Sequence, residues 1–316
     1  MVMRDLYSIG EMVIDFIPGS EPASYIRKAG GAPANVAIAA AKNGLRSAMC
    51  CKVGDDDFGR FLMDTLTEYN VEAACPELCS EAVTTMAFVT LAENGERRFT
   101  FARKLGADML LSEADVKEAD IADSAIIHAG SCSLSAHPEA DATVKAMRLG
   151  HEHGKLVSFD VNYRNLMWND DVAACTRAVK DVLKYVDLLK ISEEEVDMMG
   201  GEAAIPSLML ENGITLVVQT LGSEGARAYF GGTSFDVPGR HVKAIDATGA
   251  GDAFWGAFLS KLRLSGVEKA SDLTEEIIRQ AMDYGNVSGC ICVQQKGAIA
   301  AIPTREQIEA YMKGSN

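Results

Sequence analysis

The sequence lacks an uninterrupted apolar run long enough to span a membrane. Its opening stretch, MVMRDLYSIGEMVIDF, is broken by Arg4, Asp5, Glu11 and Asp15, so it matches neither a signal peptide nor a transmembrane helix. Positive charge is also scarce, since 30 Lys and Arg stand against 45 Asp and Glu, for a formal net charge of −15. This balance disfavours nucleic acid and membrane surfaces as partners. We therefore expect a cytoplasmic protein whose anionic ligands meet a locally positive site.

Paired cysteine motifs and flexible linkers are missing as well. The spacings Cys50-Cys51, Cys75-x3-Cys79 and Cys290-x-Cys292 contain no paired C-x-x-C of a zinc site, so we expect reduced thiols that are mostly buried. A length of 316 residues would allow two domains. Because no segment rich in Pro, Ser or Gly divides the chain, we expect a single domain over residues 1–316.

Apolar, β-branched runs alternate with helical patterns through the middle of the chain. Runs of this kind, separated by helices, predict a parallel sheet of βαβ units in an α/β fold. Ligands of such sheets bind at the carboxyl ends of the strands. The predicted strands are 124–130, 155–161, 186–192 and 214–220, and the predicted helices include 138–153 and 170–184.

Residues 83–103 have a different pattern, because polar and apolar side chains alternate on both sides of Asn94-Gly95. This pattern predicts an antiparallel hairpin. Together with a strand-like segment around 11–27, it predicts a small β-lid beside the main sheet. We therefore expect lid excursions at about 11–27 and 83–103 within the single domain.

Two glycine-rich turns carry the candidate chemistry. In the first, AGGAPANVAIAAAKNG (29–44), Gly30 and Gly31 permit a sharp turn and Pro33 suits the start of a helix. A packing helix would explain most of this stretch, but not Asn35, a polar amide among small apolar residues. Because an amide both donates and accepts hydrogen bonds, Asn35 is a candidate for binding a ligand hydroxyl group.

The second turn, DATGAGDAFWGAF (246–258), brings Asp252 into the first turn of an apolar helix. Its small residues leave backbone N–H groups uncovered at a helix N-terminus, where an anion is stabilised. The chain contains no G-x-x-x-x-G-K-[ST], and G-x-G-x-x-G fails at Phe254. From this turn alone, Asp252 is either a helix cap or a functional carboxylate.

These two stretches resemble the two signatures of the ribokinase-like (PfkB) carbohydrate kinase family, in the right order and at the right separation. Within that family the chain is most similar to bacterial fructokinases, through GEMVIDF (10–16), RKLGADMLL (103–111) and DVNYR (160–164). The resemblance implies a three-layer α/β sandwich with a mainly parallel sheet and a small β-lid. It also implies ATP-dependent transfer of the γ-phosphoryl group to a sugar hydroxyl, with D-fructose as acceptor and fructose 6-phosphate as product.

Position by position, the resemblance implies roles for individual residues. Asp252 would be the catalytic base, and the backbone of Gly249, Ala250 and Gly251 would form the anion hole. The sugar would be held by Asp15, Gly31, Asn35, Asn162 and, reaching in from the lid, Arg103. The phosphates would face Arg164, and the nucleotide would be framed by Thr220, Gly222, Gly225 and Asn286. Glu195 would help to hold magnesium through water, and Asp246 would lie near a potassium ion.

The chain departs from the family's pattern at two positions. Ser192 stands where relatives usually carry the Asn of Asn-x-x-Glu, and Ala247 stands where a threonine is frequent. Because of the first departure, the arrangement of water around the metal is not fixed by the resemblance. Because of the second, neither is the dependence on potassium.

Three hypotheses about function remain: a fructokinase; a kinase of the same fold acting on ribose, 2-keto-3-deoxygluconate or a nucleoside; and a non-catalytic sugar or nucleotide sensor. The lid is also a candidate interface for a homodimer.

Overall fold

A nine-stranded sheet runs through the part of the chain that the computed structural model describes, residues 4–21, 23–91 and 97–314. Neighbouring strands of this sheet pair in parallel except at one edge, where β12 (Gly225–Phe230) and β13 (Thr233–Pro238) extend the sheet as an antiparallel hairpin. In spatial order the strands are β13 (Thr233–Pro238), β12 (Gly225–Phe230), β11 (Leu216–Thr220), β10 (Leu188–Ser192), β9 (Leu156–Asp160), β8 (Ser124–Gly130), β1 (Arg4–Ile9), β4 (Ser47–Cys50) and β5 (Val71–Ala73).

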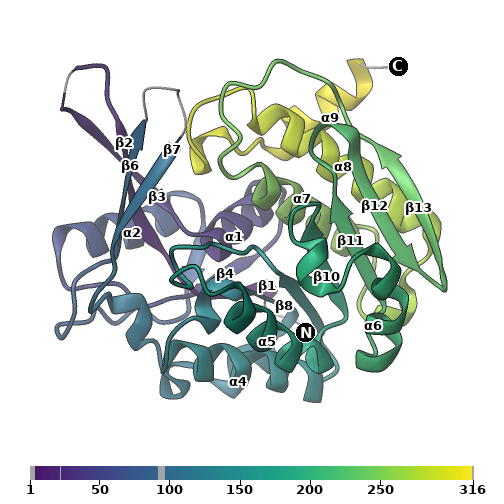
Figure 1. The fold of residues 1–316 in the computed structure, drawn as a ribbon, viewed down its shortest axis with the longest axis horizontal. Helices are drawn as coiled ribbons and strands as arrows, with labels where there is room; N and C mark the ends of the chain where they lie inside the picture. The colour runs from purple at the N-terminus through teal and green to yellow at the C-terminus, as the bar shows by residue number, and fades with distance from the viewer. Residues whose placement is uncertain (1–3, 22, 92–96, 315–316) are drawn as a thin grey trace.

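Helices cover both faces of this sheet (Figure 1). One face carries α1 (Ala32–Lys42), α7 (Ala250–Leu264) and α8 (Glu275–Cys292), and the other carries α4 (Glu139–Glu152), α5 (Val172–Val182) and α6 (Ile205–Asn212). The remaining helices are α2 (Asp57–Glu68), α3 (Glu118–Ala122) and α9 (Arg305–Gly314).

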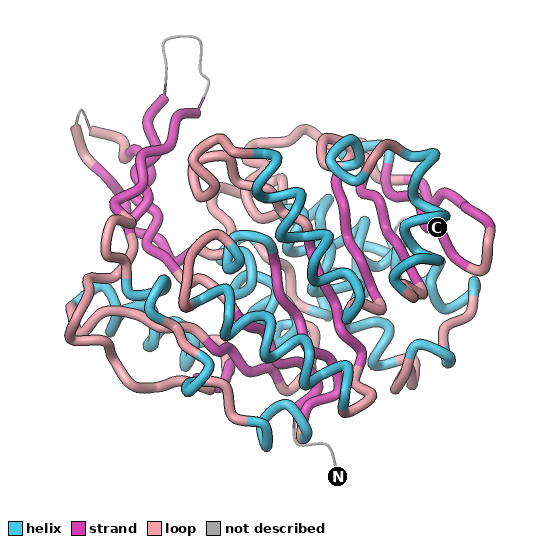
Figure 2. Tube along the Cα trace, turned by 60° about the horizontal axis from the view of Figure 1, so that its bottom comes forward, coloured by secondary structure: helices cyan, strands magenta, loops and turns pink. Residues whose placement is uncertain are grey.

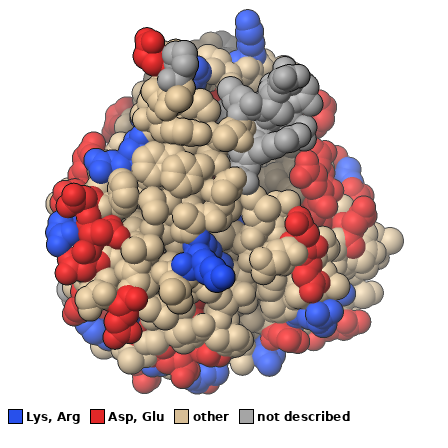
Figure 3. Space-filling view, turned by 60° about the vertical axis from the view of Figure 1, so that its left-hand side comes forward, with Lys and Arg blue, Asp and Glu red and all other residues tan. Residues whose placement is uncertain are grey.

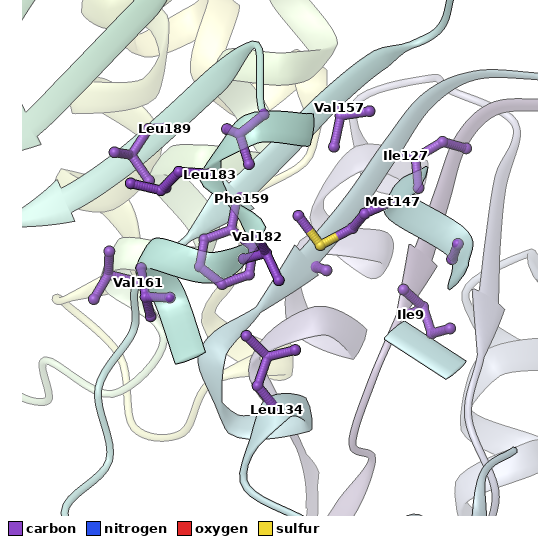
Figure 4. Close-up of a cluster of buried hydrophobic side chains, with 14 of the residues drawn as sticks. Ile9, Ile127, Leu134, Met147, Val157, Phe159, Val161, Val182, Leu183 and Leu189 are labelled. Carbon is purple, nitrogen blue, oxygen red and sulfur yellow. The ribbon is translucent and has the colours of Figure 1, made fainter. Parts of the chain in front are cut away.

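The strands are apolar on both sides, which is why two separate cores form. Leu188 packs in the cluster beside α7 and α8, whereas its neighbour Leu189 packs in the cluster beside α4 and α5. Side chains from several strands and from α4 and α5 meet in the latter cluster (Figure 4). Because successive side chains of a strand point to opposite faces, near-continuous apolar runs fill both layers. The expected α/β three-layer sandwich is therefore confirmed.

The predicted strands agree with the structure to within two residues at each end. The strand at 124–130 is β8 with the same bounds, and 214–220 is β11, which begins two residues later. The predicted helix 138–153 corresponds to α4, and 170–184 corresponds to α5. All eight cysteines are free, and all but Cys79 are buried, as expected. Among the described residues, no helix is long and apolar enough to cross a membrane.

A second, four-stranded sheet rises from one end of the main body (Figures 1 and 2). Its order is β3 (Tyr25–Gly30), β2 (Val13–Pro18), β6 (Met86–Leu91) and β7 (Arg97–Ala102). The expected hairpin of β6 and β7 is confirmed, whereas its predicted turn at Asn94-Gly95 lies outside the described residues. Ile14 and Ala29 of this sheet share an apolar cluster with α1 and α2, so its base is packed onto the main body.

Candidate active site

A cavity of about 650 Å³ lies between the carboxyl edge of the main sheet and the lid. The lid contributes Val13, Asp15 and Phe101 to its wall. The segments that follow β9, β10 and β11, together with the N-terminal ends of α1 and α7, form the rest. This is the edge at which open parallel sheets bind their ligands.

Asp252 lies in the first turn of α7, where the residue is 5% exposed. Its Oδ2 accepts a hydrogen bond from Nδ2 of Asn35, at 2.8 Å. Gly249 precedes the helix with φ 76, and no side chain caps the first turn of α7. Asp252 therefore does not cap the helix, and its carboxylate instead faces the cavity beside the open N–H groups.

The start of α1 places Asn35 opposite Asp252. Gly31 precedes this helix with φ 110, and an added Cβ there would lie 2.5 Å from the carbonyl oxygen of Glu11. Only glycine fits that turn without strain. Asn35 is buried, and within the described residues its Oδ1 has no hydrogen-bond partner. A buried unpaired acceptor is costly, so this oxygen is suited to a ligand hydroxyl.

Asp15 projects from the lid strand β2 into the same cavity. An added Cβ at Gly30 would lie 2.1 Å from the Asp15 carboxylate, so the missing side chain at position 30 makes room for it. Burial raises the pKa of Asp15 to about 6, and the charge of Arg164 opposes this shift. Asn162 and Arg164 line the same cavity from the loop after β9, where Asn162 has φ 37.

The structure does not place Arg103 in the cavity wall, contrary to its expected role as a sugar ligand. Its Nε donates to Asp108, Nη1 to Ser135 and Nη2 to Glu139, each at 2.7 Å. Asp108 and Glu139 are fully buried, so their carboxylates hold the guanidinium by charge. Arg103 thus joins the end of β7 to the main body beneath the lid.

Four other expected site residues also lie outside the cavity wall, namely Ala250, Gly225, Asn286 and Asp246. Asn286 donates to the carbonyl oxygens of Val237 and Pro238, at 3.1 Å each, and so holds the end of β13. Gly225 packs tightly against that same segment. The remaining expected residues, Asp15, Gly31, Asn35, Asn162, Arg164, Glu195, Thr220, Gly222, Gly249, Gly251 and Asp252, line one cavity.

The two expected metal ligands are engaged with backbone groups. Glu195 accepts from the N–H of Tyr163 at 2.7 Å and from that of Ser192 at 2.8 Å. Asp246 accepts from the N–H groups of Thr248 and Gly297. Among the described residues there is no group of three His, Cys, Asp or Glu side chains arranged to hold a metal. Glu193, Glu194 and Glu195 all line the cavity, however, and carboxylates are hard oxygen ligands that suit magnesium held mainly by phosphates.

Sequence reasoning missed Lys190 and Glu11, which both line the cavity. Lys190 interrupts the apolar run LLKIS of β10, and its Nζ donates to Asp160 Oδ2 at 2.8 Å. A lysine inside a buried strand was the available signal, because such a charge needs a partner. Glu11 accepts from the N–H of Ala32 at 3.1 Å, and burial raises the pKa of Glu11 to about 7.

A helix N-terminus beside a buried carboxylate, at the carboxyl edge of a parallel sheet and next to a lid, is typical of a phosphotransferase with an α/β fold. Residues 3–305 match the family described as pfkB family carbohydrate kinase. The chain belongs to that family.

Individual relatives agree over nearly the whole chain. A probable fructokinase-5 from Arabidopsis thaliana is 38% identical over 323 residues, covering 98% of both chains. The crystal structure of a fructokinase with bound ATP from Xylella fastidiosa superposes with a TM-score of 0.91 at 29% identity, covering 98% of both chains. A fructokinase from Vibrio cholerae O395, in a form that binds fructose, ADP and calcium ion, has a TM-score of 0.87 at 33% identity, covering 98% of this chain and 99% of that one.

Proposed function

We propose that this protein is an ATP-dependent fructokinase that converts D-fructose to fructose 6-phosphate. The observation that carries the proposal is the buried Asp252 carboxylate, held by Asn35 at the N-terminus of α7 inside the cavity. The similarity to fructokinases, one with bound ATP and one with fructose and ADP, supports the choice of both substrates.

In this proposal Asp252 is the general base. The 6-hydroxyl oxygen of fructose attacks the γ-phosphorus, the bond from that phosphorus to the bridging oxygen breaks, and ADP leaves with the electron pair. The hydroxyl proton passes to the Asp252 carboxylate. Because the transition state is loose, catalysis depends mostly on positioning and on stabilising charge. The backbone N–H groups around Gly249, Ala250 and Gly251 supply donors for the phosphoryl oxygens.

The lid strand β2 and helix α1 would hold the sugar. Asp15 accepts hydroxyl donors, Asn35 Oδ1 supplies an unpaired acceptor, and Gly31 lets the backbone approach closely. Asn162 lines the same cavity. Water must be kept from the γ-phosphoryl group to avoid hydrolysis of ATP, and covering the site is the role we assign to the lid.

Arg164 would face the phosphates, and Thr220 and Gly222 would border the nucleotide, since all three line the cavity. Magnesium neutralises phosphate charge when it is bound with ATP. Glu195 would hold the ion's water, because each of its oxygens keeps a lone pair beyond its backbone hydrogen bond. We also propose a potassium ion near Asp246. The carboxylate of Asp246 accepts hydrogen bonds from the backbone N–H groups of Thr248 and Gly297.

Two alternatives are less well supported. An acidic acceptor such as 2-keto-3-deoxygluconate would require a cation beside the sugar. Arg103 is ion-paired with Asp108 and Glu139, and Arg164, which also lines the cavity, is assigned to the phosphates in this proposal. A non-catalytic sensor would not need a base at the anion-binding turn, whereas Asp252 is present and buried there.

The test is an ADP-release assay with the purified protein. We expect kcat/KM for fructose to exceed the values for ribose, 2-keto-3-deoxygluconate and adenosine. A higher value for any of these acceptors would overturn fructose as the substrate while leaving the kinase assignment intact. The absence of ADP release with every sugar would instead favour the sensor.

A further inference from the structure

Glu11 lies where three parts of the proposed sugar site meet. It stands between β1 and the lid strand β2, which carries Asp15. Its Oε1 accepts from the N–H of Ala32 at the start of α1, at 3.1 Å. Arg103 and Asp108 at the base of the lid are close enough to act on its charge. A change of charge at Glu11 therefore acts on both lid hairpins and on α1.

The charges around Glu11 do not balance when every carboxyl group is ionised. Arg103 forms ion pairs with both Asp108 and Glu139, at 2.7 Å each, and Glu11 is a third carboxyl group beside the same guanidinium. Glu11 and Glu139 are 4% and 0% exposed, so little water is present to screen the excess. Because buried like charges disfavour ionisation, one of these carboxyl groups holds a proton.

Glu11 is the carboxyl group best placed to hold that proton. Within the described residues it forms no ion pair, whereas its two carboxyl neighbours are both paired with Arg103. Its Oε2 is buried there without a hydrogen-bond partner, and burial raises the pKa of Glu11 to about 7. The Cys51 and Cys132 thiols also interact with Glu11. Burial raises the pKa of each thiol well above its ordinary value, so both stay neutral.

We propose that Glu11 is a proton-dependent positioning residue of the fructose site: its neutral form holds β2, the start of α1 and the lid base together, and its ionisation loosens them. The inference rests on the proposed function for the choice of sugar. When the proton passes to the solvent, the Glu11 carboxylate repels those of Asp108 and Glu139 with little water between them. The lid strand that carries Asp15 is then less firmly held, so fructose binds more weakly as the pH rises.

The first test titrates the unaltered protein with fructose by calorimetry, without nucleotide. We expect the affinity to be about tenfold lower at about pH 8.5 than at about pH 7, because binding then requires uptake of a proton. At the higher pH, the heats in two buffers of different ionisation enthalpy should differ by the heat of about one proton per fructose. Equal heats in the two buffers, with an affinity that does not fall, would overturn the proposal.

The second test uses Glu11→Gln, which fixes the neutral form and keeps an oxygen for the N–H of Ala32. At about pH 8.5 it should bind fructose about as tightly as the unaltered protein does at about pH 7, without proton uptake. In the ADP-release assay at the higher pH, its KM for fructose should be lower than that of the unaltered protein. Proton uptake that persists in Glu11→Gln would exclude Glu11 as the titrating group.

Glu139→Gln is the matched control. Glu139 belongs to the same group of charges, and its Oε1 is also buried without a partner among the described residues, but it lies outside the cavity wall. This variant should keep both the proton uptake and the fall in affinity. If Glu139→Gln abolished both effects while Glu11→Gln retained them, Glu139 would hold the proton and the proposal would be wrong. Neither substitution adds a buried charge, so we expect both variants to fold.

Failure of the proposed function would give a different result. A protein that binds no fructose at any pH would contradict the choice of sugar, and the inference with it. Fructose that binds without a linked proton would contradict the inference alone.

Discussion

At the scale of single residues, Asp252 illustrates how neighbours decide between a structural and a chemical role. A carboxylate in the first turn of a helix commonly caps it. Asp56, the residue just before α2, does cap its helix, since its Oδ1 accepts from the N–H groups of Phe58 and Gly59. Asp252 accepts from Asn35 instead and faces the cavity. We therefore predict that substitution of Asp252 affects catalysis, whereas substitution of Asp56 affects stability.

Asp252→Asn should lower kcat by about 10²–10⁴-fold while leaving the free energy of unfolding nearly unchanged, because a positioned base is lost but no cap is removed. Asp56→Ala is the control. It should cost about 0.5–2 kcal/mol of stability and leave kcat intact. The measurements are steady-state kinetics and urea unfolding. Near-normal turnover of Asp252→Asn would exclude Asp252 as the base.

At the scale of elements, the lid depends on how its strands are joined to the main body. Arg103 follows β7 and is paired with Asp108 and with Glu139 of α4. Thr85, just before β6, also donates to Asp108. One buried cluster therefore holds the base of the lid hairpin at both of its strands.

Arg103→Ala should destabilise the protein by about 3–5 kcal/mol, because it leaves two buried carboxylates without their cation. It should also raise the KM for fructose, since the lid that carries Asp15 is then less well held. Arg227→Ala is a surface control, with ion pairs to Glu202 and Asp236, and should lose less than about 1 kcal/mol. A raised KM without loss of stability in Arg103→Ala would instead support direct contact with the sugar.

The outer edge of the lid also presents apolar side chains. Tyr25 and Ile26 on the edge strand β3 are 44% and 48% exposed. The side of the molecule that includes the lid shows a broad area with few charged side chains (Figure 3). Both features fit the predicted homodimer.

We predict that the protein sediments as a dimer and that Ile26→Lys shifts it to a monomer, because a charge would then be buried in the interface. Leu210→Lys provides a control, since Leu210 is 87% exposed on α6, on the main body. Sedimentation velocity over a range of concentrations measures the oligomeric state of both variants and of the unaltered protein. A monomer at all concentrations would exclude the interface.

At the scale of the whole molecule, buried carboxylates link stability to pH. Burial raises the pKa of Glu11 from its ordinary value of 4.5 to about 7, although the charge of Arg103 opposes this shift. Burial also raises the pKa of Glu139, which is packed against Arg103 and Asp108. A raised folded-state pKa means that the folded protein holds the proton more tightly than the unfolded chain does. The stability that Glu11 contributes through this tighter proton binding is fully present below about pH 4.5 and is lost as the pH rises through about 7.

Glu11→Gln should therefore gain stability relative to the unaltered protein as the pH rises from about 5 to 8, by up to about 3 kcal/mol. Glutamine stays neutral, and its oxygen can still accept from the N–H of Ala32. Urea unfolding at several pH values measures the difference. A difference that does not change with pH would show that Glu11 does not titrate in this range.

The layers of the fold follow from local patterns. Apolar runs such as 124–130 must be buried on both faces, and the helical segments between them supply the cover. The turn at Gly249 to Gly251 likewise predicts an anion site, because uncovered N–H groups at a helix start are a property of adjacent residues. The sequence by itself therefore determined the fold class, the lid strands and the glycine-rich turn at the start of α7, which we predict to bind phosphate.

Tertiary structure alone decided which side chains meet. Asn35 and Asp252 are 217 positions apart, and Lys190 and Asp160 are 30 positions apart, yet each pair shares a hydrogen bond. Arg103 has the same charge whether it faces a sugar or two buried carboxylates, and only the packing of α4 against the lid base selects the second. Local propensity carries no information about such contacts, because they depend on the register and crossing of elements that are distant in the chain.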